Sequence, residues 1–163
     1  MAVTPERMAE AKAILGNLVQ HLHDIKLNFA QEELEDRFVI RFNMSGDDIP
    51  MRFFIYINPK NQLITLHSPI SVTFSEDKLD LGCKAICAIN YRLVDGDFQI
   101  DIRDGEVLFN MSNSYAGSLI STEVFDYMLG MSINIVDEYN DKLLMLSKGL
   151  IDFDTLKSSL NYN

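Results

Sequence analysis

The order of elements predicted over residues 77–146 constrains the fold of this chain more than any other feature. A segment that is mostly apolar runs from Asp77 to Leu93, and Lys84 is the only charged residue between Leu81 and Tyr91. This composition is typical of a helix buried on more than one side. A ribbon of two alternating strands follows and turns at Asp104-Gly105, a dipeptide typical of tight two-residue hairpins. A second long helix begins near Ser121 and stops at Lys148-Gly149.

The N-terminal half predicts one helix and then four strands. Residues 4–23 carry an apolar stripe at helical spacing, with Thr4 as N-cap and Pro5 at the first helical position. The pattern then changes to period two and predicts strands near residues 27–30, 38–44, 51–58 and 62–67, joined by short polar loops. Residues 51–58 are apolar on both faces, which indicates a central strand, and Ser68-Pro69 is expected to end this meander.

This order predicts a single α+β domain over residues 1–163. The sheet is antiparallel, a four-strand meander plus a two-strand ribbon, with helices packed on it in the order α-ββββ-α-ββ-α. Strands do not alternate with helices along the chain, which argues against a parallel doubly wound sheet. A short C-terminal segment, Phe153 to Leu160, is expected to add a docked turn of helix.

Charge and cysteine usage narrow the function classes. The chain of 163 residues has a formal net charge of −10, which argues against binding to nucleic acid or to anionic lipid, because both need clustered Lys and Arg. No apolar stretch approaches the ~18 residues of a membrane span. The segment Met1–Glu6 lacks the basic and apolar regions of a secretory signal, and the two cysteines form no C-x-x-C motif, so we expect a cytoplasmic protein.

No catalytic or metal site can be assembled from the sequence. Asp95–Glu106 has oxygen-bearing side chains at several EF-hand positions, but Ile100 occupies the position that requires glycine. Cys83 and Cys87 lie four apart on one helix without further ligands nearby, which favours buried free thiols. His21, His23 and His67 form no zinc site and no nucleophile–base pair. We therefore expect no enzyme activity, no cofactor and no metal.

The middle of the chain resembles the YbjN-type domain, a family of proposed bacterial sensory transduction regulators. The resemblance rests on the helix ending in Asn90, Gly96-x-Phe98, Asp104-Gly105, Leu119-x-Ser121 and Asp137-x-Tyr139. It is strongest over residues 77–146 and implies the fold of type III secretion chaperones. It also implies a homodimer that binds protein and is not an enzyme.

Two surfaces follow as candidate interaction sites. The helix face with Leu81, Ala85 and Ala88 is expected to stay exposed on a monomer and to form a dimer interface, because small residues let two helices approach closely. The alternative is that the first or last helix covers this stripe within one chain. The second surface is a sheet face with Arg41, Phe54, Tyr56 and Leu108, where an unidentified protein or peptide partner is expected to bind.

The leading function is therefore a non-catalytic dimeric adaptor or chaperone-like protein-binding module. The alternative is a regulatory domain that binds a small molecule in a pocket between sheet and helices, and an enzyme is the third. A deep polar cavity would favour the alternative, and an exposed grooved sheet without such a cavity would favour the adaptor.

Overall fold

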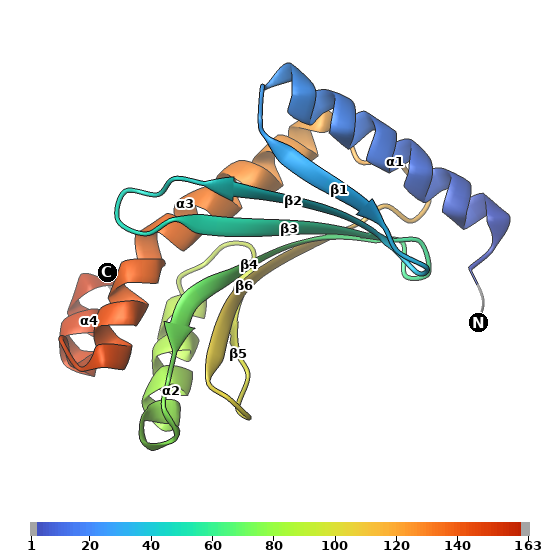
Figure 1. The fold of residues 1–163 in the computed structure, drawn as a ribbon. Coiled ribbons are helices and arrows are strands. Elements are labelled where there is room, and N and C mark those ends of the chain that lie inside the picture. Colours follow the sequence, from blue (N-terminus) through green and yellow to red (C-terminus); the bar gives the residue numbers. More distant parts are fainter. Residues whose placement is uncertain (1–2, 161–163) are drawn as a thin grey trace.

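The computed structural model describes residues 3–160. Met1 and Ala2, the first residues of the segment without a secretory-signal pattern, lie outside the described residues. Six strands and four α-helices follow one another along the chain (Figure 1). The strands are β1 (Phe29–Glu33), β2 (Phe38–Met44), β3 (Met51–Asn58), β4 (Leu63–Thr73), β5 (Asp97–Ile100) and β6 (Glu106–Ser114). The helices are α1 (Pro5–Asp24), α2 (Leu79–Asn90), α3 (Thr122–Lys148) and α4 (Phe153–Ser159), with a 3-10 turn, η1 (Glu76–Lys78), before α2.

All six strands form one antiparallel sheet in the order β1-β2-β3-β4-β6-β5. The first four strands are the predicted meander, and β6 joins the predicted ribbon to it by pairing with β4. The α+β class and the predicted order of elements are confirmed. β3 lies in the interior of the sheet, as its apolar composition indicates.

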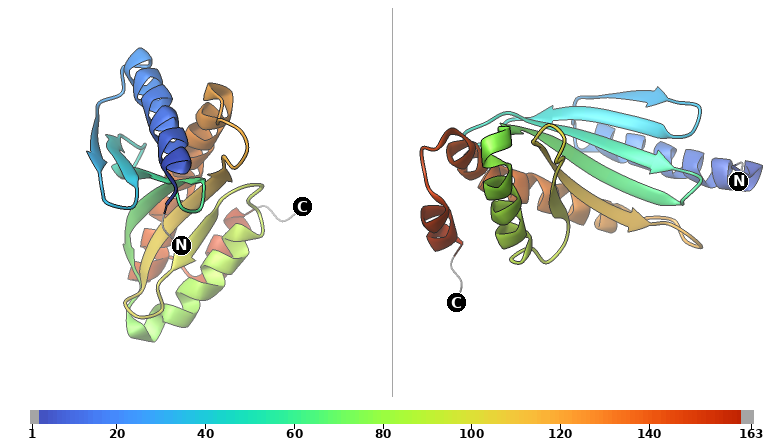
Figure 2. Two further views of the ribbon diagram at one scale, coloured as in Figure 1. Left: turned by 90° about the vertical axis from the view of Figure 1, so that its right-hand side faces the viewer. Right: turned by 90° about the horizontal axis from the view of Figure 1, so that it is seen from below.

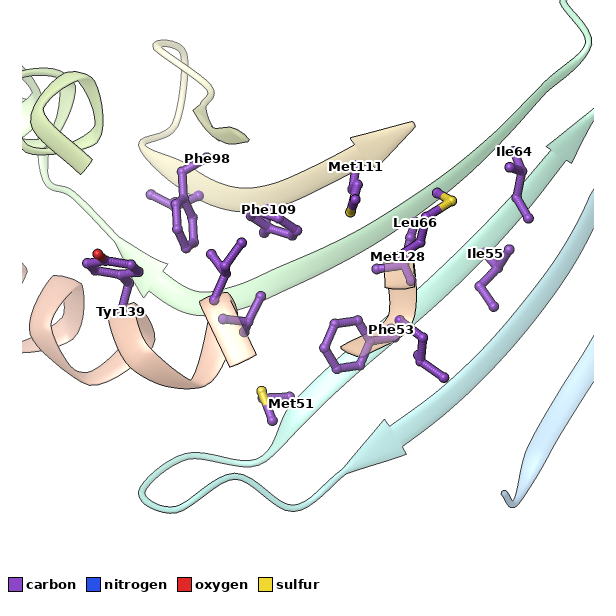
Figure 3. Packing of buried hydrophobic residues seen from close by; sticks show 14 of the residues in the cluster. Met51, Phe53, Ile55, Ile64, Leu66, Phe98, Phe109, Met111, Met128 and Tyr139 are labelled. Atoms are coloured by element: carbon purple, nitrogen blue, oxygen red, sulfur yellow. The ribbon is translucent and has the colours of Figure 1, made fainter. Parts of the chain in front are cut away.

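The hydrophobic core lies between one face of the sheet and the helices. Alternate residues of the strands point into it, and Figure 3 shows side chains of β3, β4, β6 and α3 directed toward one another. Helix α3 contacts β3, β4 and β6, while α1 contacts β3 and α3. Fully buried side chains at the centre include Phe53, Ile55, Leu66, Phe109 and Met128. The helices thus cover one face of the sheet only.

The ends of the two long helices follow local sequence signals. The Thr4 hydroxyl accepts a hydrogen bond from the Arg7 backbone N–H at 3.3 Å, and Ser121 does the same for Val124 at 3.4 Å. Gly149 ends α3 in the left-handed conformation, with φ of 72°. These three predictions are confirmed. The middle helix is shorter than the predicted segment from Asp77 to Leu93, because a 3-10 turn occupies Glu76–Lys78 and α2 extends only from Leu79 to Asn90.

Two predicted boundaries in the sheet are wrong. β4 does not end at Ser68-Pro69 but continues to Thr73, because β6 supplies a long pairing partner and the register shifts between Pro69 and Thr73. The ribbon does not turn in two residues at Asp104-Gly105. β5 ends at Ile100, and the connection is closed by a hydrogen bond from the Gly105 N–H to the Asp101 carbonyl at 2.7 Å.

The expectation of an exposed stripe on the middle helix is also wrong. Ala85 is completely buried within a single chain, and Leu81 and Ala88 are half-buried against the core. The short helix α4 lies beside α2 (Figure 2), with Lys84 Nζ 4.0 Å from the centre of the Phe153 ring. The stripe is therefore covered within a single chain, as in the alternative that the sequence left open, and both α3 and α4 contact α2. The dimer itself stays a prediction.

Candidate protein-binding site

The face of the sheet turned away from the helices, here called the open face, is the candidate site. Period-two alternation places every second strand residue there, so each buried residue of β3 is followed by an exposed or half-buried one. In β3 these are Arg52, Phe54, Tyr56 and Asn58. The helices pack on the opposite face of the sheet (Figure 1).

Strand register places one row of side chains straight across the open face. Arg41 of β2 pairs with Phe54 of β3, which pairs with His67 of β4. His67 in turn pairs with Asn110 of β6, and Asn110 with Asp97 of β5. Five strands therefore contribute neighbouring side chains to one row, with a cation at one end and an acid at the other.

Aromatic rings form the middle of this surface. Phe54 and Tyr56 lie along β3 with ring centres 6.2 Å apart and planes inclined by 11°. The Tyr56 ring also meets the edge of His67, at 5.2 Å and 66°, and Tyr56 pairs across the strands with Val39. Such half-buried aromatic side chains offer a large contact area at small entropic cost, because each has only two rotatable bonds.

A chain of hydrogen bonds holds the other half of the row in place. His67 Nε2 and Asn110 Oδ1 are 3.0 Å apart, and Asn110 Nδ2 donates to Asp97 Oδ1 at 3.1 Å. Because the amide oxygen of Asn110 can only accept, the Nε2 atom of His67 must carry a proton. Burial lowers the pKa of His67 below 6.5, although the hydrogen bond to Asn110 and the charge of Asp97 act in the opposite direction. His67 lies within β4, not at a strand end as its sequence position suggested.

The predicted site residues share the open face but not one cleft. Arg41 and Phe54 line a surface cleft of about 490 Å³ at the β1–β2–β3 end of the sheet. Leu108 lines a second cleft, of about 540 Å³, between β4 and β5 with Pro69 and Gln99. Tyr56 lies next to the first cleft along β3. The four residues therefore share one face of the sheet, and the structure separates Leu108 from the other three. Binding of a partner on this face stays a prediction.

The first cleft contains residues that the sequence prediction missed. Arg52 lies two residues before Phe54 on β3 and pairs with Asn43 of β2, so both side chains belong to the open face. Asn28 precedes β1 and lines the same cleft. Period-two alternation from Phe54 would have placed Arg52 on this face, but only the register between strands brings the three side chains together.

The edge of the sheet at β5 is closed by a side chain. Asn90, the last residue of α2, accepts from the Phe98 N–H at 2.8 Å and donates to the Phe98 carbonyl at 2.9 Å. These two bonds satisfy the N–H and C=O of Phe98, which lie in an edge strand and would otherwise be free to pair with another chain. An incoming segment therefore meets the open face or the β1 edge more readily than β5.

The remaining candidates are placed apart from this face. Cys83 and Cys87 are free thiols, and Cys87 is exposed, so the prediction that both are buried is wrong. Across residues 3–160, no group of three or more His, Cys, Asp or Glu side chains is placed to hold a metal ion. None of the helices in that range is both long and apolar enough to cross a membrane.

Comparison with known proteins gives a match at the level of the fold. No family model matches the sequence. No curated protein matches it either. Among solved structures, the chain is similar to YbjN from E. coli, a proposed transcription regulator, with a TM-score of 0.58 and 15% sequence identity. The match covers 83% of this chain and 92% of that one. At this identity the likeness concerns the fold alone, and it agrees with the order of helices and strands described above: the chain has a YbjN-like fold.

Proposed function

We propose that this protein is a non-catalytic, dimeric adaptor or chaperone-like module that binds a segment of a partner protein on the open face. The observation that carries the proposal is the aromatic surface of Phe54 and Tyr56, which no helix between residues 3 and 160 covers. Half-buried aromatic side chains on an uncovered face are enriched in protein interfaces, where they supply most of the binding energy.

The arrangement of cavities favours this function over the small-molecule alternative. That alternative requires a pocket between the sheet and the helices, and the buried apolar side chains of the core lie in this space (Figure 3). The two clefts described above are instead open grooves on the sheet surface. A groove across strands suits an extended peptide, because successive side chains of the peptide can enter it while its backbone runs along the surface.

A regulatory role through a protein partner fits the acidic charge of the chain. The solved structure with the same fold is described as a proposed transcription regulator, but a formal net charge of −10 opposes direct contact with a phosphate backbone. We therefore propose that the regulatory role acts through the binding of a protein partner. The two free thiols favour the reducing cytoplasm as the working compartment.

The proposal can be tested by capture with paired tyrosine variants. Tyr56→Ala removes a ring from the open face, and Tyr127→Ala removes one from the helix layer, where Tyr127 is 46% exposed. Immobilised wild-type protein and both variants are incubated with lysate of the source cells, and bound proteins are quantified by mass spectrometry. We expect a partner that is retained by wild type and Tyr127→Ala and lost with Tyr56→Ala. Equal retention by all three proteins would refute the open face as the binding site.

A further inference from the structure

We propose that the cleft around Arg41 and Arg52 binds an extended peptide segment that carries a carboxylate next to a large apolar side chain. This inference rests on the proposed function and names the chemistry of its partner. The cleft of about 490 Å³ lies where β1, β2 and β3 run side by side. Its lining side chains on the open face are Asn28, Ala30, Arg41, Asn43, Arg52 and Phe54.

The charge of this cleft is opposite to that of the whole chain. The chain has 24 acidic and 14 basic residues, yet two arginines and no acidic residue line the cleft. A local positive surface on an acidic protein attracts a negative group, and it does so most strongly at low salt. Charge complementarity therefore points to an anionic occupant.

Both guanidinium groups are available for such an occupant. The Arg41 side chain is 60% exposed, and its ion pair is with Glu32 at 4.0 Å, the outer limit for such a contact. The Arg52 side chain makes no hydrogen bond or ion pair with any residue from 3 to 160, while its backbone carbonyl accepts a hydrogen bond from the buried Ser68 hydroxyl at 2.9 Å. The backbone of Arg52 is thus fixed and its charged group is uncompensated.

The spacing of the two arginines suits one carboxylate or two neighbouring ones. Arg41 pairs with Phe54, and Arg52 pairs with Asn43, so the arginines are diagonal neighbours across β2 and β3. Diagonal neighbours lie roughly 7–8 Å apart at their Cα atoms, which long side chains bridge readily. Guanidinium groups bind carboxylates in a bidentate manner, with shorter and stronger hydrogen bonds than neutral donors make.

The remaining side chains explain why we infer a peptide. The rings of Phe54 and Tyr56 continue from the arginines along β3 and provide an apolar floor. The amides of Asn28 and Asn43 can both donate to and accept from a peptide backbone. A nucleic acid strand is disfavoured, because two arginines compensate only about two phosphates while the rest of the acidic chain repels the others.

The test is selection from a random peptide display library on the full-length protein. We expect the selected peptides to be enriched in Asp or Glu beside an aromatic or aliphatic residue. Synthetic versions of the best peptides are then titrated against wild type, the double variant Arg41→Gln/Arg52→Gln, and the control Arg92→Gln, whose arginine is exposed just after α2 and lines neither cleft. We expect Kd to rise at least about tenfold in the double variant and to change less than about twofold in the control. Urea unfolding of each variant verifies that it is folded.

The other outcomes separate the inference from the proposed function. Selected peptides that are neutral or basic, or that bind the double variant as tightly as wild type, would overturn the carboxylate site and leave protein binding intact. A library that yields no binder would overturn both. Displacement of the peptide by oligothymidylate or by free glutarate at comparable concentration would overturn the peptide assignment in favour of a nucleic acid or a small dicarboxylate.

Discussion

At the scale of single residues, Asn90 links the end of α2 to the edge of the sheet. Its amide makes both hydrogen bonds to the Phe98 backbone. We expect Asn90→Ala to lower the free energy of unfolding by roughly 1–3 kcal/mol, because the substitution leaves a backbone donor and an acceptor without partners. Urea denaturation measures the change. Asn113→Ala is the control, because Asn113 is exposed on β6, and we expect less than about 0.5 kcal/mol there. Equal losses for both variants would contradict the role of Asn90.

His67 makes the stability of the sheet depend on pH. Its pKa in the folded state lies below 6.5, the value expected for the unfolded chain, because burial disfavours the charged ring. The unfolded state therefore binds more protons as the pH falls below about 6.5, and the folded state loses stability there. We expect His67→Gln to be more stable relative to wild type at pH 5.5 than at pH 7.5. A relative stability that does not change with pH, or an NMR titration of the ring above 6.5, would contradict this.

At the scale of elements, the sequence predicts what is encoded locally. The start of α1 at Thr4 and the two ends of α3 depend on caps a few residues away, and they are confirmed. The extension of β4 to Thr73 depends on pairing with β6, which is about 40 residues distant in the chain, so no local pattern reveals it. The burial of α2 is not encoded locally either, because more than one of its faces is apolar and contacts with β5, α3 and α4 together decide which residues are buried.

The candidate site also has features that the sequence predicts and features that only the structure reveals. Alternation along β3 predicts that Phe54 and Tyr56 share one face, because successive side chains of a strand point to opposite faces of the sheet. The row from His67 through Asn110 to Asp97 could not be predicted, because it depends on the register of three strands. The Arg41–Arg52 cleft requires register for the same reason.

The connection between β5 and β6 is fixed by a glycine packed against the end of β4. Gly105 has φ of 76°, and a Cβ atom there would lie 1.9 Å from the Phe74 carbonyl oxygen. Gly117 also has φ of 76°, but nothing lies within 4 Å of its Cβ position. We expect Gly117→Ala to cost about 1–2 kcal/mol from the backbone conformation alone, and Gly105→Ala to cost clearly more in thermal or urea unfolding. Equal costs would show that the contact with Phe74 can relax freely.

At the scale of the whole molecule, a substitution of the buried Ala85 tests folding and dimerisation separately. Because Ala85 is completely buried in one chain, we expect Ala85→Glu to lower the free energy of unfolding by roughly 2–5 kcal/mol. Ala13→Glu is the control, because Ala13 is exposed on α1. Light scattering at micromolar concentration measures the oligomeric state, and we expect a dimer that uses a surface other than the α2 stripe. A monomer mass for wild type would refute the dimer. An Ala85→Glu variant that is folded but monomeric would show that the dimer interface lies on α2.

The central claim, that the open face receives the partner, is tested most directly by photo-crosslinking in the source cells. A benzophenone amino acid replaces Tyr56 on the open face in one variant and Tyr127 on α3 in another, so that the same probe reports on the two opposite layers of the molecule. We predict that irradiation yields a specific crosslinked product from position 56, that position 127 does not form it, and that Arg41→Gln/Arg52→Gln reduces its yield. The same product from position 127 and none from position 56 would contradict the account.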